Sequence, residues 1–573
     1  MGKLNLKLWK RFIVLAKPYW QSDEKWQAWG LLVLLILLLA GYSGSNVLFN
    51  RQSGEFASAL AARDGHRFWR AVLLFAGLLV VAVPIYSYYY YVRDRLAIQW
   101  RRWLTDRVLT RYFGKRSYYR LVAAPEIDNP DQRVSEDVGS FTQQSLNFLL
   151  LFASASFELV AFSGVLWSIS RVLVLILVLY AALGTLVTVG VFSGRMIELY
   201  FEKLKREANF RFGLIRIREN AESIAFYRGE GQEKAQLGLR FGQLFDNFIR
   251  LIRWSLGLNL FSYAYSFTTL VLPSLIIAPR VLSGELEVGR VIQASGAFSA
   301  VLTALTVFVN NMEDLSRFAA GVERLDTFVD RLQQPDFAPG RAAADRSRIA
   351  TQEGDELRLD DVTLQTPDYS RTLIKALSVQ VPAGEGLMIV GESGCGKSSL
   401  LRAIAGLWDS GSGSMVRPNL DNLLFLPQHA YTILGTLRRQ LSYPNLDRHL
   451  DDSELSDALR QVNLPDLVER SGGFDAEVDW EKVLSVGERQ RLAFARILLN
   501  RPRYVLLDEA TSSLDRQNEA ALYELLASMS TTVVSVSHHP SLVKYHSHVL
   551  ELSGDGCWRL CAAGEFHFSE EEL

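Results

Sequence analysis

The chain has 573 residues, 49% of them hydrophobic, and carries 61 Lys and Arg against 62 Asp and Glu. This length predicts two or more domains, because a single hydrophobic core rarely serves more than about 250–300 residues. A net charge of -1 argues against a nucleic-acid partner, which requires a basic excess or a basic face.

Hydrophobic residues are unevenly distributed along the chain. Up to about Met312 the sequence repeats uncharged stretches long enough to cross a bilayer, whereas after about Arg331 the apolar runs are short and interrupted by Gly, Asp and Arg. We therefore expect an all-α six-helix transmembrane domain over residues 1–330, in contact with membrane lipid, then a linker over 331–355 and an α/β domain over 356–573.

The three cysteines do not form the pattern of a disulfide framework. Cys395 lies inside a glycine-rich loop, which suits a reducing compartment, so the second domain is expected in the cytoplasm. A zinc site at Cys557 and Cys561 with His567 would lack a fourth ligand, so none is predicted there.

The first predicted element is a helix over residues 9–20 that lies on the membrane surface, because it mixes apolar residues with Lys10, Arg11 and Lys17. Six stretches then meet the requirement of about 20 mostly apolar residues for a membrane-spanning helix. These spans are residues 26–50, 71–92, 138–170, 172–194, 254–279 and 291–312.

Lysine and arginine in the flanks set the orientation of the spans. Basic residues precede the first span and follow the second, from Arg93 onward, which places the N-terminus in the cytoplasm by the positive-inside rule. The connections between the second and third spans and between the fourth and fifth are long and favour helix, so they are expected to extend the spans into the cytoplasm as levers.

One carboxylate, Glu158, falls inside the third span. A carboxylate within a span is costly and usually faces the bundle interior or a transport path, so Glu158 is a candidate transport residue. The alternative is a snorkelling or packed carboxylate without a role.

A phosphate-binding loop follows the strand candidate at residues 387–390 and precedes a helical stretch. In this context glycines let backbone N–H groups turn toward phosphates, Lys397 reaches the β- and γ-phosphates of ATP, and Ser398 ligates Mg²⁺. The ATP-binding residues expected here are Gly391, Glu392, Ser393, Gly394, Cys395, Gly396, Lys397, Ser398 and Ser399.

Residues 504–509 read as a buried strand that ends in two carboxylates. Asp508 is expected to hold the magnesium through its water shell, and Glu509 to polarise the attacking water as a general base. The alternative is a pair of structural caps.

Residues 484–491, which read Leu-Ser-Val-Gly-Glu-Arg-Gln-Arg, resemble the signature of the ATP-binding-cassette (ABC) family. The resemblance implies that Ser485, Gly487 and Glu488 bind the γ-phosphate of an ATP held by a partner subunit. Val486 and Glu488 stand where the commonest signature has Gly and Gln, but the donors at Ser485 and Gly487 remain, so activity is expected.

Further motifs follow in the order of the family. Gln428 resembles the Q-loop glutamine, a magnesium contact with a part in catalysis, and Asp515 resembles the aspartate of the D-loop. His538 resembles the switch histidine that contacts the γ-phosphate, whereas the resemblance implies no role for His539. Tyr369 is the candidate to stack on adenine, although its Pro-Asp-Tyr-Ser context is also ordinary turn sequence.

The chain contains one phosphate-binding loop and one signature. In the family each ATP lies between the loop of one ATPase and the signature of the other, so the resemblance implies a dimer. A homodimer is the simplest assembly, and a related half-transporter is the alternative partner.

The order of the two domains resembles the exporter fold, and the loop sequences at residues 127–133 and 218–227 resemble the D subfamily of ABC transporters. That subfamily includes peroxisomal carriers of fatty acyl-coenzyme A and bacterial relatives that take up peptides and cobalamin. The plain alternatives are a helix-start turn for the first loop and an ordinary charged helix for the second.

We expect an ATP hydrolase coupled to transport in a bacterial inner membrane, with ATP and Mg²⁺ as cofactors and a small hydrophilic solute such as cobalamin, or a peptide, as the imported cargo. Two alternatives stay open: an acyl-coenzyme A transporter, and a membrane ATPase that is indifferent to solute and acts as a regulator or channel.

Overall fold

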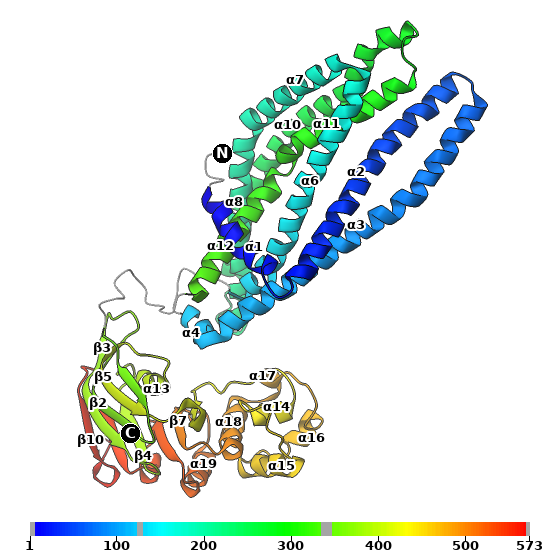
Figure 1. Cartoon of the computed structure of the whole chain (residues 1–573). Helices are drawn as coiled ribbons and strands as arrows, with labels where there is room; N and C mark the ends of the chain where they lie inside the picture. The colour runs from blue at the N-terminus through cyan, green and yellow to red at the C-terminus, as the bar shows by residue number, and fades with distance from the viewer. Residues whose placement is uncertain (1–5, 123–129, 334–346, 569–573) are drawn as a thin grey trace. The chain divides into compact units, whose positions relative to one another are not determined.

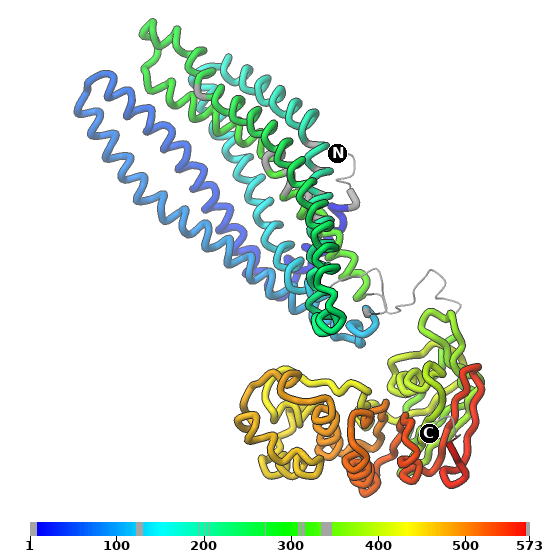
Figure 2. The backbone as a smooth tube through the Cα atoms, turned by 180° about the vertical axis from the view of Figure 1, so that it is seen from behind, coloured from blue at the N-terminus to red at the C-terminus, as the bar shows by residue number. Residues whose placement is uncertain are grey.

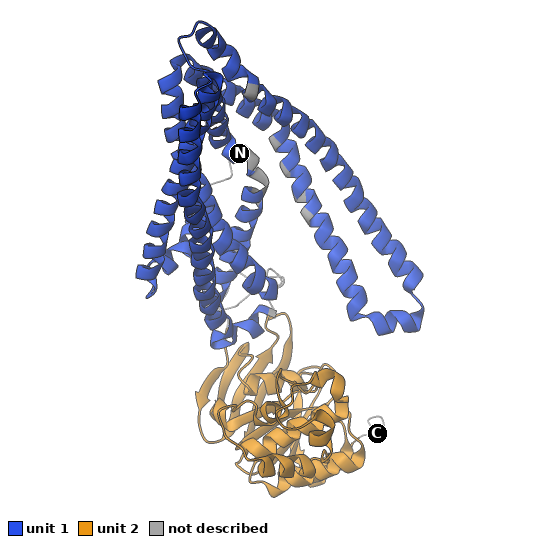
Figure 3. Ribbon diagram, turned by 90° about the vertical axis from the view of Figure 1, so that its right-hand side faces the viewer, with its two compact units in different colours: residues 1–337 blue, residues 338–573 orange. Residues whose placement is uncertain are grey.

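The computed structural model describes residues 6–122, 130–333 and 347–568, which divide into two compact units, residues 1–337 and 338–573 (Figures 1 and 3). The start of the first subfamily loop, residues 127–129, lies outside the described residues.

The first unit is entirely helical in its described part. Its elements are α1 (Leu6–Trp20), α2 (Lys25–Ala61), α3 (Gly65–Phe113), η1 (Gly114–Arg116), α4 (Ser117–Val122), α5 (Pro130–Gln132), the π-helical η2 (Arg133–Asp137), α6 (Val138–Ile169), α7 (Arg171–Val187), the π-helical η3 (Thr188–Ser193), α8 (Gly194–Glu219), α9 (Ala221–Tyr227), α10 (Glu230–Leu282), α11 (Gly289–Asn310) and α12 (Met312–Gln333).

Six described helices in this unit are long and apolar enough to cross a membrane, which confirms the predicted six-helix transmembrane domain. Each predicted span lies on one of them, the fourth running from α7 through η3. The sixth ends two residues early, because α12 begins at Met312. The chain continues helically well beyond the apolar windows, and α10 alone has 53 residues.

The long helices α8 and α10 lie side by side, with α9 near their end (Figure 2). Asn247, buried on α10, donates from Nδ2 to the carbonyl of Leu199 on α8 at 3.1 Å, and Arg206 donates to the carbonyl of Gln243 at 3.0 Å. These bonds join side chains to the neighbouring backbone, so the two helices form one paired element.

Helix α1 packs on the membrane unit along one face, where Phe12 lies 5.7 Å from Phe141 between ring centroids and Arg11 pairs with Asp326 at 3.3 Å. Tyr19 is buried and stacks on Trp100 of α3, with ring centroids 5.5 Å apart and an interplanar angle of 10°. Trp9 and Val14 remain exposed on other faces of the helix. A helix with one packed face and exposed apolar and basic side chains elsewhere fits the predicted position at a membrane surface.

Small residues set the closest approach between α2 and α11. A methyl group at Gly289 would overlap the carbonyl oxygen of Gly54, and the Gly289 N–H donates to the Ser58 hydroxyl at 3.1 Å. Membrane helices use such small residues to bring their backbones together, since burial of apolar surface contributes little there.

The second unit is an α/β fold with two sheets. The first has the order β1-β5-β2-β3 and the second β10-β9-β4-β8-β7-β6. The strands are β1 (Ala350–Glu353), β2 (Leu357–Gln365), β3 (Thr372–Val381), β4 (Gly386–Gly391), β5 (Gly411–Arg417), β6 (Leu423–Leu426), β7 (Tyr504–Asp508), β8 (Thr532–Val536), β9 (His548–Leu552) and β10 (Trp558–Ala562).

Strands β4, β6, β7, β8 and β9 pair in parallel, and β7 and β8 are buried at every position. Buried parallel strands require helices on both faces, which explains their continuous apolar sequences. The helices are α13 (Lys397–Ile404), α14 (Leu437–Ser442), α15 (Asp452–Gln461), α16 (Leu467–Ser471), α17 (Trp480–Val483), α18 (Val486–Asn500) and α19 (Arg516–Ser528), and η6 (Pro540–Tyr545) is one of the short 3₁₀ turns.

The proposed linker boundary needs one correction. Residues 350–353, inside the predicted linker 331–355, form β1 and pair with β5, and α12 already occupies the first part of that linker up to Gln333. All four β1 residues are exposed, so this edge strand lacks the apolar pattern from which a strand is predicted.

We expect Gly289→Leu to destabilise the membrane unit, because a side chain there must displace the α2 backbone at Gly54. Overpacking of this kind lowers the melting temperature by about 5 °C. Gly77→Leu is the matched control, since a side chain at Gly77 meets nothing within 4 Å. Thermal unfolding of the purified protein in detergent measures both, and equal melting temperatures would show that the α2–α11 contact adapts freely.

Candidate functional site

The glycine-rich loop lies where β4 ends and α13 begins. β4 pairs with β8 and β9 in the middle of the larger sheet, and the loop leaves at the edge where parallel strands carry their carboxyl ends. Gly391, Gly394 and Gly396 have φ values of 136°, 82° and 113°. Such values suit glycine alone, and they turn backbone N–H groups into a cradle for an anion at a helix N-terminus.

The ammonium group of Lys397 folds over this loop. It is buried and donates to the carbonyl oxygens of Gly391 at 2.6 Å and Glu392 at 2.9 Å. An ammonium group binds phosphate oxygens more strongly than neutral carbonyls. The lysine is therefore poised to exchange these bonds for the phosphates of a nucleotide.

Ser398 and Asp508 meet directly at the base of the loop. The Ser398 hydroxyl donates to Asp508 Oδ1 at 2.7 Å, which joins the first turn of α13 to the end of β7. Burial raises the pKa of Asp508, although this hydrogen bond opposes the shift. A hydroxyl and a carboxylate at this separation are hard oxygen ligands of the kind that Mg²⁺ binds.

Gln428 and His538, which were predicted from separate motifs, both lie at the carboxylate of Glu509. Gln428 Nε2 donates to Glu509 Oε2 at 2.9 Å, and His538 Nε2 lies 3.5 Å from Glu509 Oε1. Glu509 has a φ of 48°, a left-handed conformation that is uncommon outside glycine and often marks functional sites. Strand β7 therefore delivers Asp508 toward the loop and Glu509 toward Gln428 and His538.

The signature forms the N-terminus of α18 and is built around a charged cap. Ser485 Oγ accepts from the Glu488 N–H at 3.3 Å, and Glu488 Oε2 accepts from the Ser485 N–H at 2.8 Å, a capping box. Glu488 Oε1 accepts from Arg470 at 2.6 Å. Burial alone would raise the pKa of Glu488, but these hydrogen bonds and the guanidinium together lower it.

This cap explains how the signature carries Glu488 where the family commonly has an amide. A bare carboxylate would repel a phosphate, but Arg470 balances its charge. A carboxylate offers no donor to a phosphate, so its part in the site is to hold the helix end at which Ser485 and Gly487 are presented.

Two other predicted nucleotide contacts lie in turns. Asp515 caps α19 by accepting from the N–H groups of Gln517 and Asn518 at 3.0 and 2.9 Å. Tyr369 has a φ of 61° in the turn between β2 and β3, and its hydroxyl donates to the carbonyl of Ser347 at 3.2 Å. The turn is followed by Leu373, whose Cβ would lie 3.2 Å from a methyl group placed at Gly396. The start of β3 therefore lies against the glycine-rich loop.

Sequence reasoning missed a buried carboxylate behind the candidate catalytic residues. Glu519 is 1% exposed, accepts from the Thr511 hydroxyl at 2.7 Å, and pairs with His539 Nδ1 at 2.7 Å. It thereby links the segment after Glu509 to the neighbour of His538. The position of Glu519, one turn after the cap Asp515, only weakly indicated a role in the site. Acidic residues in the first turn of a helix usually interact favourably with the helix dipole.

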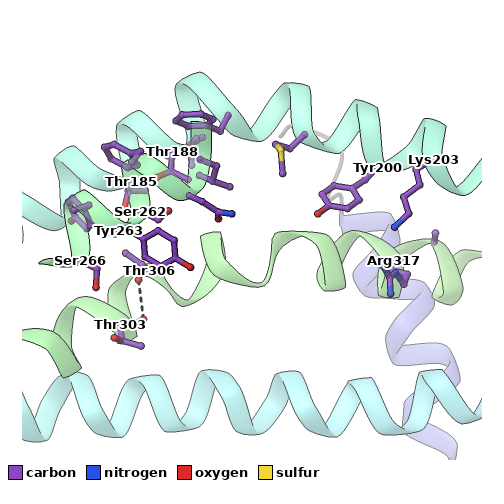
Figure 4. Close-up of a pocket in the computed structure, with 18 of the residues that line it drawn as sticks. Thr185, Thr188, Tyr200, Lys203, Ser262, Tyr263, Ser266, Thr303, Thr306 and Arg317 are labelled. Carbon is purple, nitrogen blue, oxygen red and sulfur yellow. Dashed lines mark hydrogen bonds between the residues drawn. The ribbon is translucent and has the colours of Figure 1, made fainter. Parts of the chain in front are cut away.

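A cavity of about 1360 Å³ lies within the membrane unit, and the described residues that line it come from α5, η2, α7, η3, α8, α10, α11 and α12. One end is rich in hydroxyl groups and the other is basic, as Figure 4 shows. The hydroxyl end includes Thr185, Thr188, Ser262, Ser266, Thr303 and Thr306, and the basic end includes Lys203, Lys205, Arg211, Arg317 and Arg324.

The candidate transport residue Glu158 is not among the described residues that line this cavity. Its side chain is half-buried on α6 and lies beside Asn46 of α2. Asn46 Oδ1 in turn accepts from the Tyr86 hydroxyl of α3 at 2.6 Å. The three side chains make a polar connection between three spans.

Comparisons with known proteins agree on one family. The model described as "ABC transporter transmembrane region 2" matches residues 15–282, and the model described as "ABC transporter" matches residues 374–512.

Three relatives match nearly the whole chain. An uncharacterized ABC transporter ATP-binding protein of Synechocystis is 45% identical, over 94% of this chain and 82% of its own. The chloroplastic ABC transporter D family member 2 of Arabidopsis thaliana is 35% identical, over 95% and 86%. The lysosomal cobalamin transporter of Homo sapiens is 32% identical, over 97% of each.

We expect Glu509→Gln to bind ATP but to hydrolyse it at least about 100-fold more slowly, since loss of a general base commonly has that effect. The amide still accepts from Gln428 but cannot take a proton from water. Phosphate release and retention of labelled ATP measure the two properties separately. Glu565→Gln, at an exposed position of the same unit, is the control, and near-normal turnover in Glu509→Gln would remove Glu509 from the chemistry.

Proposed function

The chain belongs to the ABC transporter family, and from that premise we propose that two identical copies import a hydrophilic solute, cobalamin being the favoured one, across a bacterial inner membrane. The family couples ATP hydrolysis to transport, and its half-transporters act as dimers. The cargo, the direction, the homodimer and the membrane are the parts that we propose.

The observation that carries the proposal is the chemistry of the cavity in the membrane unit. Thr188 and Thr303 donate to carbonyls of their own helices, Gly184 at 2.8 Å and Ser299 at 2.9 Å. A hydroxyl group that donates its hydrogen bond to a carbonyl in this way can still accept hydrogen bonds through its lone pairs. This end of the cavity suits a solute with N–H donors, such as the carboxamide groups of a corrinoid or the backbone of a peptide.

The opposite end suits an anionic group on the same solute. Five basic side chains and two acidic ones, Glu136 and Glu207, line the cavity, and Arg324 is already paired with Asp137 at 2.7 Å. Lys203 is half-buried, with its ammonium 4.8 Å from the ring centroid of Phe248. Lysine and arginine bind phosphate well, and cobalamin combines one phosphodiester with several carboxamides. The human relative at 32% identity is named for cobalamin transport.

The roles proposed in the ATPase unit follow from its geometry. The loop at residues 391–399, with Lys397, binds the phosphates. Ser398 and Gln428 would supply oxygen ligands for Mg²⁺, and Asp508 would hold the ion through its water shell, so that the ion neutralises phosphate charge when bound. Glu509 takes the proton of the attacking water, and Gln428 and His538 hold its carboxylate in place. Ser485 and Gly487 are offered to the ATP of the partner copy, which requires a dimer.

Uptake by proteoliposomes tests the cargo and the direction together. We expect ATP-dependent movement of labelled cobalamin toward the side of the ATPase unit, and none in Glu509→Gln. Lys203→Gln should reduce uptake about tenfold by removing a charge from the cavity. Lys10→Gln is the matched control, because Lys10 is exposed on α1.

Two results would contradict the proposed cargo. Movement of acyl-coenzyme A without movement of cobalamin would favour a fatty acyl-coenzyme A transporter. The basic end of the cavity also suits the phosphate groups of coenzyme A. ATP hydrolysis that no solute changes, with no uptake of either compound, would favour a membrane ATPase that acts as a regulator or channel.

We expect Glu158→Gln to keep basal ATP hydrolysis within about twofold and to change uptake by about tenfold. The substitution preserves the size of the side chain and its capacity to bond with Asn46, and removes only the charge within the span. Uptake and ATP hydrolysis are measured on the same proteoliposomes between pH 6 and 8. Unaltered uptake throughout that range would leave Glu158 as a packing residue.

A further inference from the structure

The side chain of Gln490 bridges two segments of the ATPase site. It lies on α18, five residues after the cap Ser485, and is 1% exposed. Its Nε2 donates to the carbonyl oxygen of Gln428 at 3.3 Å, and its Oε1 accepts from the N–H of Ser513 at 3.1 Å. One amide group therefore connects the signature helix to two segments that are distant in sequence.

Both of those segments contact the reacting end of the site. The Gln428 side chain donates to Glu509 at 2.9 Å. Gln490 therefore holds the backbone of the same residue whose side chain contacts Glu509. Ser513 lies between Glu509 and Asp515, and its carbonyl would be 3.1 Å from a methyl group at Gly487. The first turns of α18 are thus in contact with the segment after the catalytic strand.

The chemistry of this position suits an amide in particular. Glutamine provides one N–H donor and one carbonyl acceptor at the end of the same planar group. A carboxylate could accept from Ser513 but would repel the Gln428 carbonyl, and an apolar side chain would leave both backbone groups without this partner. Buried polar groups that lose their partner are costly, so a change here shifts the segments instead.

We propose that Gln490 is a positioning residue for ATP hydrolysis, which carries movement of the signature helix to the Gln428–Glu509 contact. The inference rests on the proposed function, in which Ser485 and Gly487 bind the partner's ATP and Glu509 acts as the base. When ATP draws the signature helix inward, Gln490 moves both flanking segments with it, so Glu509 is aligned only in the closed dimer. Gln490 itself is buried, and its amide is bonded to two backbone groups, so it acts through the segments that it holds.

The test compares Gln490→Met with Gln490→Glu in the full-length protein in proteoliposomes. Methionine keeps the length and loses both bonds, whereas glutamate keeps the acceptor for Ser513 and loses the donor to Gln428. We expect kcat for ATP to fall at least tenfold in both variants, while KM changes less than about threefold. Gln461→Met, the same substitution at an exposed position on α15, should leave both constants unchanged.

Two further measurements separate positioning from general damage. Trapped labelled ATP in the Glu509→Gln background counts the dimers that close, and we expect Gln490→Met to trap as much nucleotide as its parent. A fall in kcat that only matches a fall in trapped nucleotide would make Gln490 a packing residue and overturn the proposal, as would unchanged kcat.

The single variant Glu509→Gln, measured in the same experiment, separates the proposed role of Glu509 from the proposed role of Gln490. If it hydrolyses ATP normally, the proposed role of Glu509 as the general base fails, and with it the contact through which Gln490 is proposed to act. If it is inactive while Gln490→Met is normal, only the inference on Gln490 fails.

Discussion

The hydrogen bond between Ser398 and Asp508 is the contact around which the ATPase unit is arranged. It joins the helix that follows β4 to the end of β7, and these strands are separated in the sheet only by β8. Because parallel strands end at one edge, the loop, the carboxylates and the residues after β8 converge there.

Charge balance is the second constraint on the site. The loop and Lys397 attract phosphate, so an acidic residue in the signature would oppose the function of the partner copy. The structure resolves this conflict locally, since Arg470 and the capping box hold both oxygens of Glu488. The departure from the commonest signature is therefore coupled to Arg470, a residue outside the signature that the motif comparison alone did not single out.

Much of the fold could be predicted from the sequence because its strongest signals are local. A span must satisfy its own backbone, so six apolar runs were sufficient to predict six helices. The loop at residues 391–399 and the strand that ends at Asp508 and Glu509 carry their chemistry in consecutive residues. Strand β1 carries no such signal, because its four residues are exposed and its pairing with β5 depends on a distant segment.

The remaining parts of the candidate sites depend on contacts between distant residues. Glu519, Gln490 and Arg470 owe their positions to partners in other elements, and neither composition nor spacing specifies such pairs. The same limit applied to Glu158. The sequence predicted a costly carboxylate within a span, but its connection to Asn46 and the hydroxyl of Tyr86 required three spans to be assembled.

The fourth span shows how one helix face gives the cavity two different ends. The residues that line the cavity from α7, η3 and α8 include a stripe with a spacing of three or four positions, formed by Thr185, Thr188, Phe192, Met196, Tyr200 and Lys203. The π-helical turn at η3 lies in the middle of this stripe, and π-helical turns commonly occur at functional sites. The stripe changes from hydroxyl groups within the apolar span to aromatic and then basic groups beyond it. The proposed solute, with amide donors at one end and a phosphate at the other, therefore matches the cavity in only one orientation, because an inverted solute would place its phosphate among hydroxyl groups and its amides among basic side chains.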